Sequence, residues 1–343
     1  MDFKENCRST AEKDPLFGHV ASFQMRPNAE RMDFMEIVVQ VCLLALGFWL
    51  LVKGSDWFVD GAAGIAAKLG VPQLIIGLTI VAMGTSAPEL AVSLSSGLKG
   101  NASICIGNVL GSNMLNVLII LGLCAVITNV KVEPSTLKID LPFMILITLL
   151  MLVLGWTGEQ VVWSEVLILI VLFVSYLTYL YFEARKNPVQ DEAEQAPSSW
   201  LKLIEYLILG LAVIVLGSNI AVDSATALAK IIGISDRIIG LTIVALGTSL
   251  PELFTSVTAA RKGNADIAVG NIVGSNIFNI LFILGTTALV LPVPFAPNFR
   301  MDALFATAAG ILLLVGAARK KMLTRGLGIV MLLCYGGYFL YLL

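Results

Sequence analysis

The sequence predicts an all-α integral membrane protein with ten transmembrane helices, arranged as two five-helix repeats of inverted topology. The composition, the spacing of apolar stretches and an internal duplication support this prediction. Of the 343 residues, 57% are hydrophobic and only 13% are charged, and the mean hydropathy is +0.89. A soluble domain carries roughly 25% charged residues. A water-soluble fold of this size could not bury so much apolar surface, whereas a bundle surrounded by lipid can.

The composition also excludes several classes of function. The net charge of −2 offers no basic surface for nucleic acid. The one histidine, His19, lies in a polar N-terminal stretch, which excludes a serine triad and a histidine zinc site. The five cysteines are scattered without a CxxC pair, so neither a disulfide framework nor a zinc site is expected.

Ten apolar stretches are long enough to cross a membrane, since a helix needs about 20 residues to span roughly 30 Å of hydrocarbon. The first and the sixth stretch exceed one span, which suggests a steep tilt or an extension along the surface. The stretches are 36–68, 72–98, 102–127, 138–156, 161–182, 200–232, 236–260, 265–290, 302–318 and 323–342.

One polar linker, residues 183–199, divides these stretches into halves at 36–182 and 200–343. The polar residues 1–35 contain no apolar core that resembles a signal peptide. We expect this N-terminal extension to be disordered or to be a start-site artefact, with synthesis beginning at Met32 or Met35.

The second half of the sequence repeats the first at a fixed offset. IIGLTIVAMGTSAPEL at 75–90 recurs as IIGLTIVALGTSLPEL at 238–253, with 14 of 16 positions identical and an offset of 163 residues. At the same offset GNVLGSNMLN matches GNIVGSNIFN, and GSDWFVD matches GSNIAVD. Three blocks in one register indicate a duplicated half.

Each half holds five expected spans, so the second half must enter the membrane from the opposite side, as in many secondary transporters. Cytoplasmic loops carry an excess of Lys and Arg, and here the loops after odd-numbered spans are the basic ones. We therefore expect the 183–199 linker in the cytoplasm and both termini outside. The basic residues after odd-numbered spans are Lys68, Lys131, Lys138, Arg185, Lys186, Lys202, Arg261, Lys262, Arg319, Lys320, Lys321 and Arg325. Those after even-numbered spans are Lys99, Lys230, Arg237 and Arg300.

Each half places one carboxylate inside an apolar span, Glu89 in GTSAPEL and Glu252 in GTSLPEL. A carboxylate at membrane depth is costly and usually marks an ion path or a proton relay. A lone glutamate could instead be protonated and hydrogen-bond another helix. Two copies among the same oxygen-bearing neighbours favour an ion site.

A proline precedes each glutamate, Pro88 and Pro251. Proline lacks an N–H and crowds the carbonyl four residues earlier, which belongs to Gly84 or Gly247. We expect each helix to open there and to turn carbonyl oxygens sideways, which is tolerated at membrane depth where protein, water or an ion satisfies them. A simple kink would leave the adjacent acid unexplained.

Helical spacing gathers further oxygen atoms beside each glutamate, because residues three or four apart share one face. Hydroxyl, amide, carbonyl and carboxylate oxygens without sulfur or imidazole suit Ca²⁺ or Na⁺ rather than Zn²⁺ or copper. The expected set is Thr85, Ser86, Glu89, Ser112 and Asn116 with Thr248, Ser249, Glu252, Ser275 and Asn279.

Other repeated residues have a structural interpretation. Paired glycines in the GNxxGSN motifs let helices approach closely, and the remaining asparagines could be ligands or packing partners, with packing favoured. The glycines are Gly107, Gly111, Gly270 and Gly274, and the asparagines are Asn108, Asn113, Asn271 and Asn276. Asp60 and Asp223 match at the offset, but they lie near span ends, where a solvated role is expected.

Two ionised glutamates give the site a charge of −2, which opposes its movement across the low-dielectric membrane. One Ca²⁺ or two Na⁺ would neutralise this charge equally. Two cargoes that compete for one site between inverted halves meet the requirement for exchange.

GTSxPEL followed by GNxxGSNxxN, present twice, resembles the alpha repeats of the sodium/calcium exchangers within the cation/calcium antiporter superfamily. The resemblance covers essentially all of residues 36–343 and implies the sodium/calcium exchanger fold, in a compact prokaryotic form. It implies Ca²⁺ transport driven by Na⁺ through alternating access. It also implies the ten ligands named above together with the backbone carbonyls of Ala82 and Ala245.

Two details refine the resemblance. Many relatives, especially in the potassium-dependent branch, have Asp where this chain has Asn279, which argues against K⁺ co-transport. Proton/calcium exchangers usually show a GNxxE-type pattern where this chain has GTSxPE, which favours Na⁺ as the driving ion.

Three other functions stay open on the residues alone. An H⁺/Ca²⁺ or other monovalent cation/H⁺ antiporter would use the same glutamates as proton carriers. A membrane-embedded enzyme would need a catalytic base for which no histidine is at hand, and inverted halves around a closed acidic site argue against a channel. We expect Ca²⁺ and Na⁺ as substrates, no prosthetic group, and a monomer in the cell (inner) membrane.

Overall fold

The computed structural model describes residues 26–99, 102–158, 160–188, 199–233, 245–297 and 299–342. These residues are almost entirely helical, and the strands among them are only two residues long. Residues 1–25 of the expected extension and most of the 183–199 linker lie outside the described residues.

The elements of the first half are α1 (Arg26–Leu69), α2 (Gln73–Ile76), η1 (Gly77–Val81), α3 (Ala82–Thr85), α4 (Ala87–Leu98), α5 (Ser103–Met114), η2 (Leu115–Leu121), α6 (Gly122–Ile127), β1 (Val130–Lys131), η3 (Thr136–Asp140), α7 (Leu141–Gly158), β2 (Gln160–Val161) and α8 (Trp163–Lys186). Those of the second half are α10 (Trp200–Ile231), α12 (Ala245–Thr248), α13 (Leu250–Arg261), α14 (Ala265–Phe278), η5 (Asn279–Leu284), α15 (Gly285–Val290), β3 (Val293–Pro294), α16 (Phe299–Ala318), β4 (Met322–Leu323) and α17 (Arg325–Leu342). The η segments are π-helical.

In the described ranges, eight helices are long and apolar enough to cross a membrane, and the bent pair Gln73–Thr85 and Ala87–Leu98 makes a ninth. These nine coincide with nine of the predicted stretches. The remaining stretch, 236–260, falls partly on residues 234–244, which are not described, so the tenth span stays a prediction. Helix α1 begins at Arg26, earlier than the expected start of the first span at 36.

Two short sheets demonstrate the inversion of the halves. β1 pairs with β4 and β2 pairs with β3, both antiparallel. Helix α7 runs from the β1 side to β2, so the two sheets lie at opposite ends of the bundle. Val130 of β1 and Val293 of β3 are equivalent at the repeat offset, yet they belong to different sheets. Equivalent segments therefore lie at opposite ends, as inverted repeats require.

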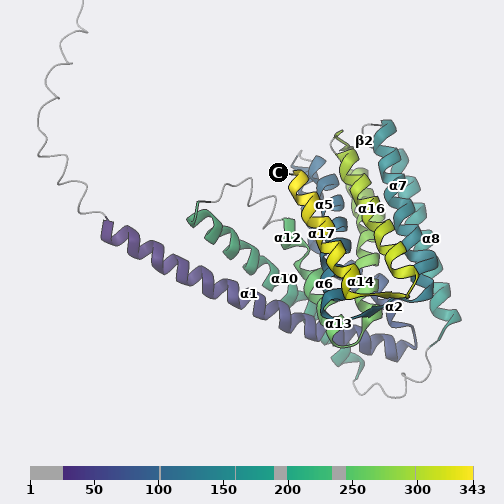
Figure 1. Ribbon diagram of the computed structural model, residues 1–343, viewed down its shortest axis with the longest axis horizontal. Coiled ribbons are helices and arrows are strands. Elements are labelled where there is room, and N and C mark those ends of the chain that lie inside the picture. The colour runs from purple at the N-terminus through teal and green to yellow at the C-terminus, as the bar shows by residue number, and fades with distance from the viewer. Residues whose placement is uncertain are drawn as a thin grey trace, which may run out of the picture.

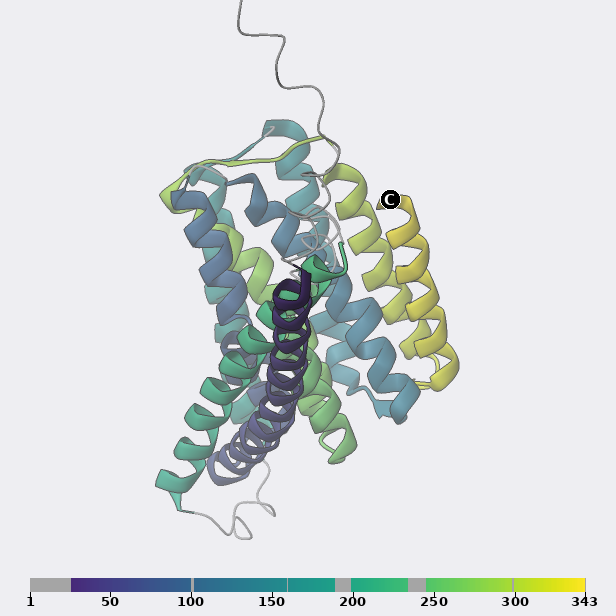
Figure 2. The same ribbon diagram turned by 90° about the vertical axis from the view of Figure 1, so that its left-hand side faces the viewer.

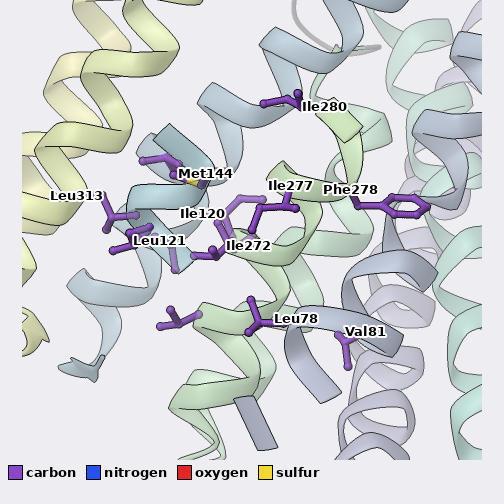
Figure 3. Packing of buried hydrophobic residues seen from close by; sticks show 14 of the residues in the cluster. Leu78, Val81, Ile120, Leu121, Met144, Ile272, Ile277, Phe278, Ile280 and Leu313 are labelled. Carbon is purple, nitrogen blue, oxygen red and sulfur yellow. The ribbon is translucent and has the colours of Figure 1, made fainter. Parts of the chain in front are cut away.

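Two composite helices, α5–η2–α6 and α14–η5–α15, form the centre of the bundle. Every residue from Ile267 to Phe278 is buried, and α14 packs against α2, η1 and α3 of the other half. Figure 3 shows side chains of both halves meeting here, with Ile120 of η2 beside Ile272 and Ile277 of α14. The two repeats therefore meet in a buried core, whose apolar side chains surround a few buried polar ones.

Helices α1 and α10 form a long pair that extends beyond the rest of the bundle (Figures 1 and 2). Gly47 faces Ala221 and Gly61 faces Leu207, so the two helices run antiparallel. A Cβ added at Gly47 or Gly61 would lie 2.8 or 2.7 Å from the backbone nitrogen of its partner, which is closer than side chains allow. Glycine is therefore needed for this contact.

Candidate functional site

Both predicted helix openings are present, and each lies at a serine two residues before the proline. Ser86, with φ −84° and ψ 8°, separates α3 from α4, and the two parts meet at 43°. Ser249, with φ −91° and ψ 5°, separates α12 from α13. Pro88 and Pro251 become the second residues of new helices, where a missing N–H leaves no intrahelical bond unmade.

The carbonyl that Pro251 releases is satisfied by protein, as membrane depth demands. The Ser218 hydroxyl of α10 donates to the backbone oxygen of Gly247 at 2.8 Å. Its equivalent in the first half, Ser55, is fully buried and its hydroxyl has no hydrogen-bond partner among the described residues. The two repeats therefore share this serine but not its hydrogen bond.

Glu89 and Glu252 stand at the third position of α4 and α13 and are each 1% exposed. The first turn of a helix has free N–H groups and the positive end of the dipole, which favour a negative charge. The break that creates these helix starts thus places a carboxylate where a buried anion is best tolerated.

The two serines at the breaks connect the halves. A Ser-x-x-Glu sequence at a helix start is typical of a capping box, but neither serine side chain caps its own helix. Ser86 Oγ instead donates to Glu252 Oε1 at 2.8 Å, and Ser249 Oγ donates to Glu89 Oε1 at 3.4 Å. Each carboxylate is therefore held by the opposite repeat, so both acids belong to one site.

Further predicted residues lie in the same cluster. Ser249 Oγ is 3.4 Å from Ser112 Oγ. The backbone oxygen of Ala82 accepts from Ser275 Oγ at 3.4 Å and lies 3.4 Å from Thr85 Oγ1. The Thr85 hydroxyl donates to Asn271 Oδ1 of the opposite repeat at 3.0 Å. Of the remaining predicted residues, Thr248 is half-buried at the end of α12 and Ala245 is the first residue of that segment.

The predicted amide ligands, Asn116 and Asn279, lie at or next to the start of a π-helical segment, a feature frequent at functional sites. Asn116 Nδ2 donates to Asn276 Oδ1 at 2.9 Å, and Asn279 Nδ2 donates to Asn113 Oδ1 at 3.0 Å. Both bonds cross between the halves, as do those of the serines.

Four buried oxygens of the predicted set have no hydrogen-bond donor within the described ranges: Glu89 Oε2, Glu252 Oε2, Asn116 Oδ1 and Asn279 Oδ1. Buried acceptors are normally paired, so a matched pair from each half points to a positive ligand. No three His, Cys, Asp or Glu side chains group around a metal position in the described part of the chain. Two acids and neutral oxygens are the donor set of a hard cation.

The prediction that Asn108 and Asn271 pack between helices is confirmed. Asn108 Nδ2 donates to the backbone oxygen of Glu89 at 3.0 Å, and Asn271 Nδ2 donates to that of Glu252 at 3.4 Å. Each also bonds a serine of the same helix as the glutamate. These amides hold the glutamate backbones, and Asn271 also contacts the candidate site, because its Oδ1 accepts from Thr85 Oγ1 of the opposite repeat at 3.0 Å.

The expectation that the paired glycines serve packing is confirmed in the second half. A Cβ at Gly270 would lie 2.8 Å from Leu74 O, and a Cβ at Gly274 would lie 2.6 Å from Leu78 O. In the first half, the segment that would face Gly111 lies outside the described residues.

A cavity of about 240 Å³ reaches the site from one side. It touches Thr248 and also Pro88, the neighbour of Glu89. Asn219 and Asp223, which are exposed, also line it, so the cavity opens at the surface beside α10.

A family model described as sodium/calcium exchanger protein matches residues 39–182 and 202–343. The chain is 37% identical over 314 residues to the putative antiporter CaxA of Alkalimonas amylolytica, a match that covers 88% of this chain and 98% of the relative. It is 35% identical over 342 residues to the sodium/calcium exchanger MaX1 of Methanosarcina acetivorans, covering 87% and 97%.

A solved structure of the sodium-calcium exchanger NCX_Mj, soaked with zero Na⁺ and Ca²⁺, matches with a TM-score of 0.78 and 31% identity, and the match covers 90% of this chain and all of that one. These similar proteins are exchangers and antiporters, not enzymes. The match spans both repeats and agrees with the resemblance carried by the GTSxPEL and GNxxGSNxxN motifs. The chain belongs to the sodium/calcium exchanger family.

Proposed function

We propose that this chain is a secondary active antiporter that exchanges Na⁺ for Ca²⁺ by alternating access at a site near the membrane midplane. The observation that carries the proposal is the reciprocal tie of Glu89 and Glu252 to Ser249 and Ser86 of the opposite repeats. The exchangers MaX1 and NCX_Mj support Na⁺ and Ca²⁺ as the substrates.

The proposed ligands are those expected from the sequence, and their oxygens suit the two ions. Asn116 and Asn279 are uncharged, so the two glutamates alone give the site its charge of −2. Moving this charge through the bilayer is costly, and one Ca²⁺ or two Na⁺ remove it. The ion-loaded protein can then change between inward and outward states.

The one-sided cavity supports alternating access. Thr248 and Val222 line the cavity and are half-buried, whereas their equivalents Thr85 and Val59 are completely buried. Chemically matched residues therefore meet water on one face of the site and protein on the other, as expected for a carrier open to one side.

The proposed orientation places the 183–199 linker in the cytoplasm and both termini outside, in the cell (inner) membrane. The excess of basic residues after odd-numbered spans supports it. Pairing of β1 with β4 brings together two of these loops, which contain Lys131 and Lys321. The inner membrane protein YrbG of Escherichia coli strain K12, 38% identical over 265 residues with 75% of this chain and 81% of the relative covered, supports this membrane.

Transport of ⁴⁵Ca²⁺ into proteoliposomes with Na⁺, K⁺ or H⁺ gradients imposed separately tests the proposal. We expect uptake when the vesicles are loaded with Na⁺ and no pH gradient is present. Uptake that requires a pH gradient would favour the H⁺/Ca²⁺ alternative. Absence of uptake under every gradient, or uptake without any counter-ion, would overturn antiport.

A further inference from the structure

We propose that Asn113 and Asn276 are positioning residues, which hold the side-chain amides of Asn116 and Asn279 so that their oxygens point to the transported cation. This inference rests on the proposed function, since it assigns roles around the same site. Neither Asn113 nor Asn276 supplies one of the oxygens that lack a hydrogen-bond donor. Each acts on the side-chain amide of a proposed ligand in the opposite repeat.

Two backbone carbonyls fix the direction of the Asn113 and Asn276 amides. Asn113 Nδ2 donates to the backbone oxygen of Asn276, and Asn276 Nδ2 donates to the backbone oxygen of Asn113, both at 3.2 Å. A carbonyl oxygen can only accept. Each of these two side chains must therefore turn its NH₂ group to the opposite backbone, and its Oδ1 must face the other way.

The fixed Oδ1 atoms then orient the proposed ligands. Asn113 Oδ1 accepts from Asn279 Nδ2, and Asn276 Oδ1 accepts from Asn116 Nδ2. A reversed amide at Asn116 or Asn279 would bring two acceptor oxygens together. The side-chain oxygens of Asn116 and Asn279 are therefore directed away from this network. They are two of the four oxygens of the predicted site that have no hydrogen-bond donor among the described residues.

Burial stabilises this orientation of the amides. Asn113 is 3% exposed, Asn276 is 2% exposed, and Asn116 and Asn279 are 1% exposed each. Water is excluded from the cluster, so an amide that lost its partner would have no substitute. Partners that orient a ligand commonly change metal affinity by about 10- to 100-fold when they are removed.

A purely structural cross-link between the halves would also place asparagines here, and the two roles differ in one measurable respect. A positioning residue matters only while the ligand that it orients is present. Its effect on affinity should therefore vanish when that ligand is removed, whereas independent effects on stability add.

The experiment is a double-mutant cycle of equilibrium ⁴⁵Ca²⁺ binding to the purified full chain in detergent. The variants are Asn113→Leu, Asn279→Ala and their combination, with Asn276→Leu and Asn116→Ala as the mirror cycle. Thr307→Val is the matched control, because Thr307 is buried and its hydroxyl bonds only its own helix. Asn113→Ser replaces Asn113→Leu if the latter does not fold.

We expect Asn113→Leu to weaken Ca²⁺ binding about tenfold in the wild-type background and less than about twofold in the Asn279→Ala background. Thr307→Val should leave binding unchanged. Additive effects, or wild-type binding by the Asn113 variants, would overturn the positioning role while leaving the antiporter intact. A wild-type chain that binds neither Ca²⁺ nor Na⁺ would overturn the proposed function together with this inference.

Discussion

The two faces of the site are built from equivalent residues, yet they differ in exposure. On one face Thr248, Val222 and Asp223 line an open cavity. On the other face the equivalents of the first two, Thr85 and Val59, are completely buried. Because these two residue types match, their difference in exposure comes from the segments packed around them.

Beside the buried face, an ion pair joins the end of α13 to α1. Lys262, at the end of α13, lies 2.7 Å from Asp60 and 3.3 Å from Asp56 of α1. At the repeat offset the same positions are Lys99, Asp223 and Asn219, and the described residues include no ion pair between Lys99 and Asp223. Equivalent positions of the two repeats therefore have different contacts in this structure, which the proposed alternating access would explain.

The largest expected effect comes from removing one of the two equivalent negative charges. Glu89→Gln or Glu252→Gln should each reduce Na⁺-driven ⁴⁵Ca²⁺ uptake by more than about 100-fold, because a buried cation then loses half of its compensating charge. Both variants should elute as folded protein on size exclusion. Glu205→Gln, an exposed change on α10, is the control. Wild-type uptake by both site variants would reject a shared site.

The sequence was sufficient to predict the repeat, the inversion and the helix openings, whereas the full ligand set stays a prediction. These features follow from the spacing of the apolar stretches, the offset between the repeats and the positions of proline. It did not predict that Ser86 and Ser249 bond across the halves, because a Ser-x-x-Glu start is equally consistent with a local cap. An offset shows which residues are equivalent, but not which ones meet.

The same limit applies to the asparagines and to the ion pair. Asn113 and Asn276 were expected to pack, and their role as orienting partners depends on the direction of hydrogen bonds, which a motif does not encode. Lys262 appeared only as one of many basic loop residues. Its contact with α1 depends on how the long α1–α10 pair lies against the bundle.

The second prediction compares the two cross-bundle serines. Ser86→Ala removes a proposed ligand oxygen and the 2.8 Å bond that orients Glu252. Loss of a partner that orients a metal ligand commonly costs about 10- to 100-fold in metal affinity, so we expect at least about tenfold weaker Ca²⁺ binding. Ser249→Ala removes a longer bond of 3.4 Å and should have a smaller effect. Equilibrium ⁴⁵Ca²⁺ binding measures both, with the exposed Ser175→Ala on α8 as control. A larger loss of affinity in Ser249→Ala than in Ser86→Ala would show that the lengths of these two bonds do not determine Ca²⁺ affinity.

The third prediction tests the asymmetry directly with an equivalent pair of cysteines. In a background that lacks Cys7, Cys42 and Cys334, Val222→Cys should react with a membrane-impermeant thiol reagent at least about tenfold faster than Val59→Cys. Val59→Cys would react only in the minor conformer that opens its face. Such conformers are commonly 0.1–10% populated, so its labelling should be at least about tenfold slower. The reagent is applied to each side of the membrane in turn, which also tests the orientation. Equal labelling from one side would contradict a site open on a single face.

The smallest expected effect concerns the ion pair of the closed face. Lys262→Gln removes contacts with Asp56 and Asp60 that are partly exposed, and such pairs contribute about 0.2–1 kcal/mol. The closed face should therefore open about 1.4- to 5-fold more often, seen as faster labelling of Val59→Cys. Lys99→Gln is the matched control: if its pair with Asp223 forms only in the opposite state, this change should slow the same labelling. An equal acceleration by both variants would mean that surface charge, and not a pair specific to one state, controls access.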